Sequence, residues 1–222
     1  MKLTILAATG ATGRHLLTQA LAAGHQVTAV VRNPAKLAEP SVRTVTADLS
    51  HPDPEALAAA VEGADAVLSA LGATSSSEPG VAWRGTEAVV AAMHATGVRR
   101  IVTLSAAPIG AVASPARPNP PKHDPGDTFL MRHLGAPLTR FFLREHYADL
   151  ARMEDVLRAA PLDWTSVRPP RLTNGPLTAT YRTALDRNLP GGTSASRADV
   201  AHCMLATLTR PDTIRHTLGV AR

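Results

Sequence analysis

Three small residues near the amino terminus are spaced so that a ligand could approach the backbone closely. Ala7, Gly10 and Gly13 stand three residues apart, between an apolar run from Leu3 to Leu6 and a helical pattern that starts at Arg14. A strand, a small-residue turn and a helix form the context in which a glycine-rich fingerprint holds pyrophosphate. The first N–H groups of a helix have no partner inside it, and the helix dipole adds partial positive charge, so an anion is stabilised there.

The first of these positions departs from the fingerprint, because it is Ala rather than Gly. Ala in a left-handed conformation has a steric cost that Gly avoids. We therefore expect Ala7 to keep a negative φ. The alternative interpretation of the stretch is an ordinary strand-to-helix turn without a ligand.

An arginine follows the second predicted strand, which covers His25 to Val31. About twenty residues beyond the glycines, an NAD site usually has Asp or Glu on the ribose, whereas Arg accommodates a 2′-phosphate. Arg32 occupies this position, and Lys36 follows one helical turn later. The sequence therefore favours NADP(H) over NAD(H). The alternative is an exposed loop arginine.

Strands and helices alternate through the first half of the chain. A short alternating strand is predicted at 41–46, a buried strand at 65–70 and a further strand at 99–104, with helices at 55–61 and 81–96. This alternation is typical of a Rossmann-like, doubly wound parallel α/β sheet flanked by helices, and ligands of such sheets bind at the carboxyl ends of the strands. Those ends carry the small-residue turn, Arg32, Asp48, Ala70 to Gly72 and Ser105, so they are predicted to converge. Taken alone, Asp48 could equally be a helix N-cap or turn residue.

The second half of the chain is less regular. Five prolines between Ala113 and Asp127 predict an irregular loop, either disordered or acting as a lid. An amphipathic stretch follows at 130–144, then a helix at 147–159, a strand at 164–167, a helix at 196–208 and a last short strand at 217–220. We expect a single domain over 1–222, with the substrate pocket built from about 106–195.

Composition excludes several classes of protein. Of the 222 residues 45% are hydrophobic and 3% aromatic, and the net charge of +5 is scattered. This argues for a folded core and a small-molecule partner rather than nucleic acid. The lone Cys203 is predicted to be a core residue, the histidines lack metal-ligand spacing, and no segment resembles a signal peptide or membrane span. A cytoplasmic monomer or homodimer without a metal is expected.

Several stretches resemble the atypical short-chain dehydrogenase/reductases of the NAD(P)H-binding, NmrA-like group, which includes the biliverdin IXβ/flavin reductases. They cover most of the chain and lie at 8–14, 30–34, 89–93, 97–102, 105–106, 164–172, 175–178 and 196–201.

The resemblance implies roles for particular residues. The turn residues would hold the pyrophosphate, Arg32 and Lys36 the 2′-phosphate, and Asp48 and Leu49 the adenine. Ala70, Leu71 and Gly72 would lie along the cofactor. Ser105 would face the nicotinamide as a hydrogen-bond donor to the carboxamide or substrate, with Pro169, Pro170 and Arg171 bordering the pocket. The residues of the turn are Thr9, Gly10, Ala11, Thr12 and Gly13.

Two departures bear on catalysis. The biliverdin/flavin reductases have His where this chain has Arg171, and Arg cannot give up a proton near neutral pH. We expect Arg171 to act as an orienting cation. The Tyr-x-x-x-Lys pair of classical short-chain dehydrogenases is also missing. His146 and Tyr147 are candidate proton donors, and the alternative for both is a surface pair at a helix start.

Three functions remain open at this level. The first is an NADPH-dependent reductase of a flat conjugated acceptor such as a flavin or quinone, because the cofactor supplies the chemistry and solvent can protonate the product. The second is a sensor that binds NADP(H) without turnover, as in NmrA. The third is an accessory reductase or coupling enzyme of aromatic polyketide biosynthesis.

Overall fold

The molecule is built on one eight-stranded sheet, which is parallel except for its last strand. The computed structural model describes residues 1–37, 39, 41–72, 80–127 and 143–222. The strand order is β3-β2-β1-β4-β5-β6-β10-β8, and β8 alone runs antiparallel, against β10. A separate two-stranded ribbon pairs β7 with β9. The strands are β1 (Lys2–Leu6), β2 (Gln26–Val31), β3 (Arg43–Thr46), β4 (Ala66–Ser69), β5 (Arg100–Leu104), β6 (Asp163–Arg168), β7 (Arg171–Thr173), β8 (Arg182–Leu185), β9 (Ser194–Ser196) and β10 (His216–Ala221).

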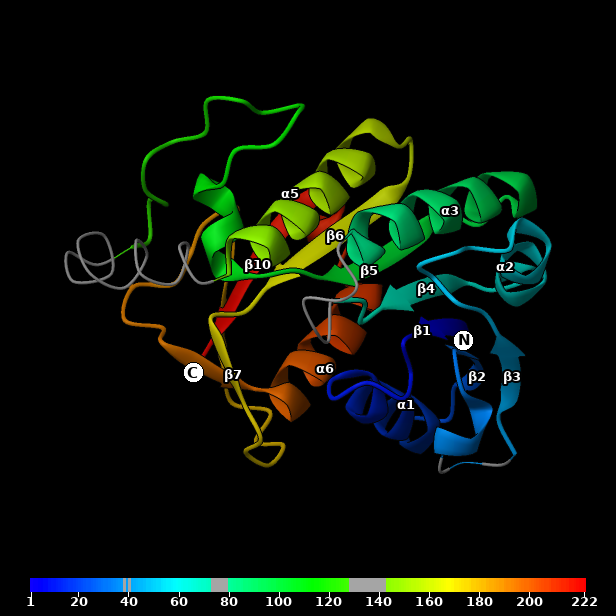
Figure 1. Ribbon diagram of the computed structural model, residues 1–222. Helices are drawn as coiled ribbons and strands as arrows, with labels where there is room; N and C mark the ends of the chain where they lie inside the picture. Colours follow the sequence, from blue (N-terminus) through cyan, green and yellow to red (C-terminus); the bar gives the residue numbers. More distant parts are fainter. Residues whose placement is uncertain (38, 40, 73–79, 128–142) are drawn as a thin grey trace.

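Helices cover both faces of the sheet. Figure 1 shows α2, α3 and α5 together on one face, and α1 and α6 on the other. The helices of the described residues are α1 (Gly13–Ala22), α2 (Pro54–Val61), α3 (Val81–Thr96), α5 (Arg144–Ala159) and α6 (Arg197–Ala206), with short 3₁₀ turns at η1 (Pro34–Lys36), η2 (Ala107–Ala111), η4 (Thr207–Thr209) and η5 (Pro211–Thr213). None of these helices is long and apolar enough to span a bilayer.

Burial on both faces explains why the central strands are apolar without alternation. All four residues of β4 are buried, and in β1 every residue after Lys2 is buried. Parallel strands covered by helices on both sides have this continuous pattern. The parallel pairing aligns the strand ends, and the amide N–H of Ala70 donates to the carbonyl of Leu6 at 3.3 Å. The carboxyl ends of β1 and β4 therefore meet, as the sequence predicts.

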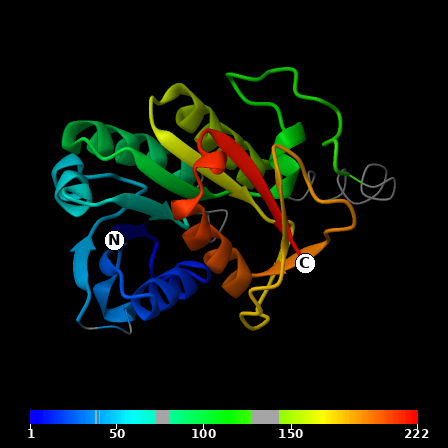
Figure 2. The same cartoon turned by 180° about the vertical axis from the view of Figure 1, so that it is seen from behind.

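The expected doubly wound parallel sheet is confirmed; in addition, β8 joins this sheet, and β7 and β9 form the separate ribbon. Sequence patterns did not predict β7, β8 or β9. Each has only three or four residues, too few to show a period. Figure 2 shows the segment that contains β8 running beside β10, on the side of β10 that faces away from β6. The stretch from 113 to 127 is irregular, as expected. Residues 73–79 and most of the stretch at 130–144 that is predicted to be amphipathic lie outside the described residues.

Burial determines the environment of Cys203 and of Arg100. Cys203 is 2% exposed within the core, and burial raises its pKa to about 12, so it is a core residue as predicted. Arg100 is a basic residue whose charge lies partly inside the protein. It is half-buried and donates to the carbonyls of Asp163 at 2.7 Å and Thr207 at 2.8 Å. Burial lowers its pKa to about 10, against the opposing effect of Asp163.

The expectation for the first turn residue is wrong. Ala7 has a φ of +56°, in the left-handed region. Its carbonyl accepts the Gly10 N–H at 2.8 Å, and this tight turn requires the unusual conformation. A left-handed non-glycine residue costs about 1–2 kcal/mol. The turn therefore contains backbone strain at the position where the fingerprint normally has Gly.

This strain predicts the effect of Ala7→Gly. The substitution removes the Cβ clash but also raises the entropy of the unfolded chain, so the expected net stabilisation is about 0.5–1 kcal/mol. Urea unfolding of the two proteins measures it. Ala8→Gly is the matched control, because Ala8 is fully buried and has no positive φ, and it should lose about 1–2 kcal/mol. Destabilisation of both variants would contradict the account of strain at Ala7.

Candidate functional site

The turn after β1 brings the start of α1 close to the backbone of the strand. A Cβ placed on Gly13 would lie 2.0 Å from the Ala7 carbonyl oxygen, so only glycine fits there. Within the described part of the chain, no hydrogen bond occupies the amide N–H groups of Ala11, Thr12 and Gly13. Thr12, the N-cap residue, makes no side-chain cap, and the first turn contains no acidic residue. These N–H groups thus form a cradle suited to an anion, which fits a pyrophosphate.

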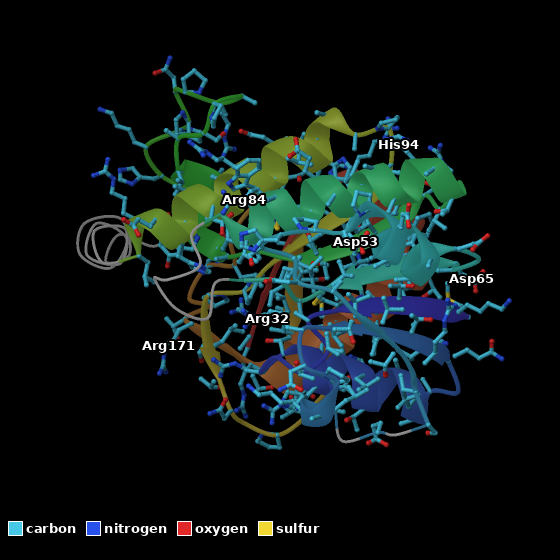
Figure 3. The ribbon with its side chains drawn as sticks, turned by 45° about the vertical axis from the view of Figure 1, so that its right-hand side comes forward. Arg32, Asp53, Asp65, Arg84, His94 and Arg171 are labelled. Carbon is cyan, nitrogen blue, oxygen red and sulfur yellow. The ribbon has the colours of Figure 1, made fainter. Side chains whose placement is uncertain are left out.

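Two predicted 2′-phosphate residues lie beyond the end of β2. Arg32 is exposed, and Asn33 caps the following 3₁₀ turn by accepting the Ala35 N–H at 3.0 Å. Lys36 is exposed in the last turn of that element. In Figure 3, Arg32 and Arg171 both lie to the left of Asp65. Asp65 directly precedes β4 and therefore marks the amino ends of the strands.

Asp48 and Leu49, predicted to flank the adenine, have different environments. Asp48 is exposed and accepts hydrogen bonds from the Ser50 backbone N–H at 3.0 Å and the Ser50 hydroxyl at 2.7 Å, which together lower its pKa. Leu49 is buried and packs beside Leu71 against Gly85 of α3, where an added Cβ would lie 3.1–3.2 Å from their side chains. The segments that follow β3 and β4 therefore pack together beneath the first turns of α3.

Helix α5 reaches the end of β4 through His146. A Cβ built on Gly72 would be 3.8 Å from the His146 ring, so the imidazole lies beside the segment predicted to follow the cofactor. Burial lowers the pKa of His146, and Asp149 opposes this shift without cancelling it. The ring is therefore neutral at pH 7. His146 is half-buried, so it is not the exposed surface residue of the alternative interpretation.

Its neighbour Tyr147 points into the core. Tyr147 is 7% exposed and belongs to a buried cluster with Ile109 of η2 and Met153 of α5. A phenol in this position is not presented to an open site. Two residues further along α5, the carboxylate of Asp149 accepts the backbone N–H groups of Ala82 at 3.1 Å and Trp83 at 2.9 Å. A residue of α5 thus caps the start of α3, whose own N-cap is a glycine.

A buried carboxylate, Glu154, ties α5 to the sheet. It is 1% exposed, and one of its oxygens accepts the hydroxyls of Ser105 and Ser166, each at 2.9 Å. The same oxygen accepts the Arg168 Nε–H at 2.8 Å, while the other oxygen binds Arg168 Nη2 and, at 2.6 Å, Arg158 Nη2. Five donors therefore converge on one carboxylate from α5, β5 and β6.

The two arginines keep Glu154 charged in the interior. Burial alone would raise its pKa, but Arg168, followed by Arg158 and the Ser105 hydroxyl, lowers the pKa to about 2. Sequence analysis missed this residue. The available signal was its place on the apolar stripe of a helix, three residues before Leu157 and four after Leu150, both of which are buried. A charged residue on such a stripe must have a partner inside the protein.

The hydroxyl of Ser105 therefore has a different hydrogen-bond partner from the one that the sequence led us to expect. The serine side chain is at the predicted place, the carboxyl end of β5, but its hydroxyl hydrogen is directed to Glu154 and not toward a ligand. Pro169 is buried and its carbonyl accepts the Ala107 N–H at 2.9 Å. Pro170 lines a small pocket with Arg168 and Asn188, and Arg171 is exposed at the start of β7.

Other hollows lie away from these residues. Two of them surround Lys2, Gln26 and Gly63 at the amino-terminal edge of the strands, opposite the turn. No group of three or more His, Cys, Asp or Glu side chains in the described residues is arranged to hold a metal ion.

Comparison with known proteins shows a match to a family model over most of the chain and a match to a curated relative over a short stretch. The model of a family described as NAD(P)H-binding matches residues 7–211. The uncharacterized protein YwnB of Bacillus subtilis is 37% identical over 78 residues, which cover 35% of this chain and 35% of YwnB. That match spans about a third of the relative's length.

Solved structures match over nearly the whole chain. The oxidoreductase ylbE of Lactococcus lactis has a TM-score of 0.79 at 21% identity, covering 100% of this chain and 91% of that one. A short-chain dehydrogenase/reductase of Veillonella parvula in complex with NADP has a TM-score of 0.74 at 19% identity, covering 100% and 94%. ChuY, an anaerobillin reductase of Escherichia coli O157:H7, has a TM-score of 0.74 at 20% identity, covering 99% and 97%. At these identities the likeness shows a shared fold.

Glu154→Ala provides a test of the buried carboxylate. The variant leaves Arg168 charged and buried without its partner, so the expected loss of stability is about 3–5 kcal/mol. Glu145→Ala is the control, because Glu145 lies on the same helix with an exposed side chain, and its effect should stay within about 0.5 kcal/mol. Chemical denaturation measures both. Similar small effects for the two variants would show that the network contributes little to folding.

Proposed function

The chain belongs to the NAD(P)H-binding family, and we propose from this premise that it is an NADPH-dependent oxidoreductase that transfers hydride to a flat conjugated acceptor, such as a flavin or a quinone. The observation that carries the proposal is the turn after β1. It has unoccupied amide N–H groups at 11–13 and a glycine that no other residue can replace, at the carboxyl edge where parallel sheets bind ligands.

The preference for NADPH rests on Arg32 and Lys36. Both are exposed beyond the end of β2, where the ribose of a dinucleotide bound at the β1 turn would lie. Two cations here suit a 2′-phosphate, and an acidic residue that would bind the 2′-hydroxyl of NAD is absent from the segment 32–36. The Veillonella parvula relative of the same fold holds NADP.

The chemistry proposed for the site demands little of the side chains. The bound cofactor would supply the hydride, and the acceptor would take its proton from solvent. The chain contributes the pyrophosphate cradle, the apolar support of Leu49 and Leu71, and an exposed cation, Arg171, that would orient an anionic acceptor. His146 is neutral at pH 7 and lies beside Gly72, so it could donate a hydrogen bond through a ring N–H. Tyr147, being buried, is not assigned a role in proton transfer.

The second candidate is a sensor that binds NADP(H) without turnover. The feature that favours it is the absence of a Tyr-x-x-x-Lys pair, since Tyr147 is followed four residues later by Ala151 and Tyr181 by Leu185. Both candidates require the same cofactor cradle, so they differ only in turnover.

Turnover is therefore the deciding measurement. We expect the purified protein to oxidise NADPH in the presence of FMN, FAD or a quinone, followed by the loss of absorbance of the reduced nicotinamide. Gly13→Ala should abolish this activity, because the new Cβ cannot coexist with the Ala7 carbonyl. Calorimetric titration of the unmutated protein with NADP supplies the control for cofactor binding. Tight NADP binding with no oxidation by any acceptor would replace the reductase by the sensor.

Cofactor choice is tested at Arg32. Loss of a charged hydrogen bond to the 2′-phosphate in Arg32→Ala should raise the Kd for NADPH by about 10- to 100-fold and leave the Kd for NADH nearly unchanged. Arg99→Ala is the control for net charge, because Arg99 is an exposed arginine just before the amino end of β5. Equal weakening of both cofactors in Arg32→Ala would refute the 2′-phosphate role.

A further inference from the structure

Glu154 decides how Ser105 can interact with a bound nicotinamide. We propose that the buried carboxylate of Glu154 fixes Ser105 as a hydrogen-bond acceptor, so that the serine oxygen receives an N–H of the nicotinamide carboxamide. The inference rests on the proposed NADPH function. It assigns Glu154 as a positioning residue, which acts on the cofactor only through Ser105.

The first step is the direction of the hydrogen bond. A carboxylate can only accept, so both oxygens of Glu154 require donors. Ser105 must therefore place its single hydroxyl hydrogen on Glu154, at an Oγ–Oε1 distance of 2.9 Å. The lone pairs of Ser105 Oγ are what remain for a ligand.

The second step is that the network keeps Glu154 from changing its state. The carboxylate is buried and bound by both Arg158 and Arg168, and its pKa lies near 2. Burial would lower the pKa of Arg168, but Glu154 raises it above the ordinary value, so the arginine also stays charged. Ser105 consequently keeps the same hydrogen-bond direction throughout the physiological pH range.

The third step places Ser105 at the nicotinamide half of the cofactor. A dinucleotide bound at the β1 turn spans the carboxyl edge, with one nucleoside on each side of β1. The cations at Arg32 and Lys36 lie on the β2 side and mark the adenosine half. On the other side the sheet continues through β4 to β5, and Ser105 follows the last residue of β5. The nicotinamide would therefore lie over this strand end.

Ser166 provides a matched control inside the same network. Its hydroxyl donates to the same Glu154 oxygen at the same distance of 2.9 Å, and it is fully buried. Ser166 pairs with Thr103 within the sheet and does not stand at the strand end. Replacing either serine by Ala removes one equivalent bond to Glu154, but only Ser105 could reach a cofactor.

The experiment compares NADP with its 3-acetylpyridine analogue, in which the carboxamide is replaced by an acetyl group that has a carbonyl but no N–H. Isothermal titration calorimetry gives the ratio of the two Kd values for each protein. A wild-type protein that accepts from the carboxamide should bind NADP about three- to tenfold more tightly than the analogue. Ser105→Ala should reduce the ratio to near one by weakening NADP alone, whereas Ser166→Ala should keep the wild-type ratio. Glu154→Gln should lower the ratio, because the serine hydrogen is no longer held by a carboxylate.

The outcomes separate this inference from the proposed function. Equal weakening of NADP and the analogue in Ser105→Ala would mean that Ser105 donates to the carbonyl, and it would overturn the inference. Unchanged Kd values for both compounds in Ser105→Ala would overturn it as well. If Glu154→Gln does not fold, the two serine variants alone decide. A wild-type protein that binds neither compound would overturn the proposed NADPH function itself.

Discussion

The buried charge of Glu154 is the interaction on which the arrangement around the site depends. Removing a carboxylate from water is costly unless it is paired and hydrogen-bonded, and here two arginines and two serines meet that requirement. The partners come from β5, β6 and α5, so the charge can be satisfied only when the helix lies at one depth and one rotation over the sheet. The position of α5 is thereby fixed.

Helix α5 then organises its neighbours through residues that lie further toward its amino terminus. Asp149 caps the start of α3 by accepting two backbone N–H groups, and His146 lies beside Gly72 at the end of β4. These residues precede Glu154 on the same helix. A single helix therefore links the carboxyl ends of β4, β5 and β6, which are the strand ends expected beneath the nicotinamide half of a cofactor.

The turn after β1 shows how strain and ligand binding are related in this fold. The carbonyl of Ala7 approaches Gly13 so closely that no Cβ can be accommodated, and Ala7 itself adopts a left-handed conformation. This close approach lets α1 begin directly behind the strand and leaves its first N–H groups open. The backbone strain at Ala7 is offset by the rest of the fold, and it is located at the turn proposed to hold the pyrophosphate; strained residues tend to cluster at functional sites.

The sequence alone determined the parallel α/β sheet, the convergence of its strand ends and the burial of Cys203. These features follow from local properties: continuous apolar runs, helical periodicity and small residues between them. The tertiary structure alone decided the roles of Glu154, Tyr147 and Ser105, because each depends on which side chain lies opposite across an interface. The positive φ of Ala7 also came only from the fold, since the approach of α1 to β1 imposes a conformation that alanine does not favour by itself. Hydrogen-bond direction at Ser105 is likewise a property of the assembled network, in which the serine hydroxyl donates to a carboxylate 49 positions further along the chain.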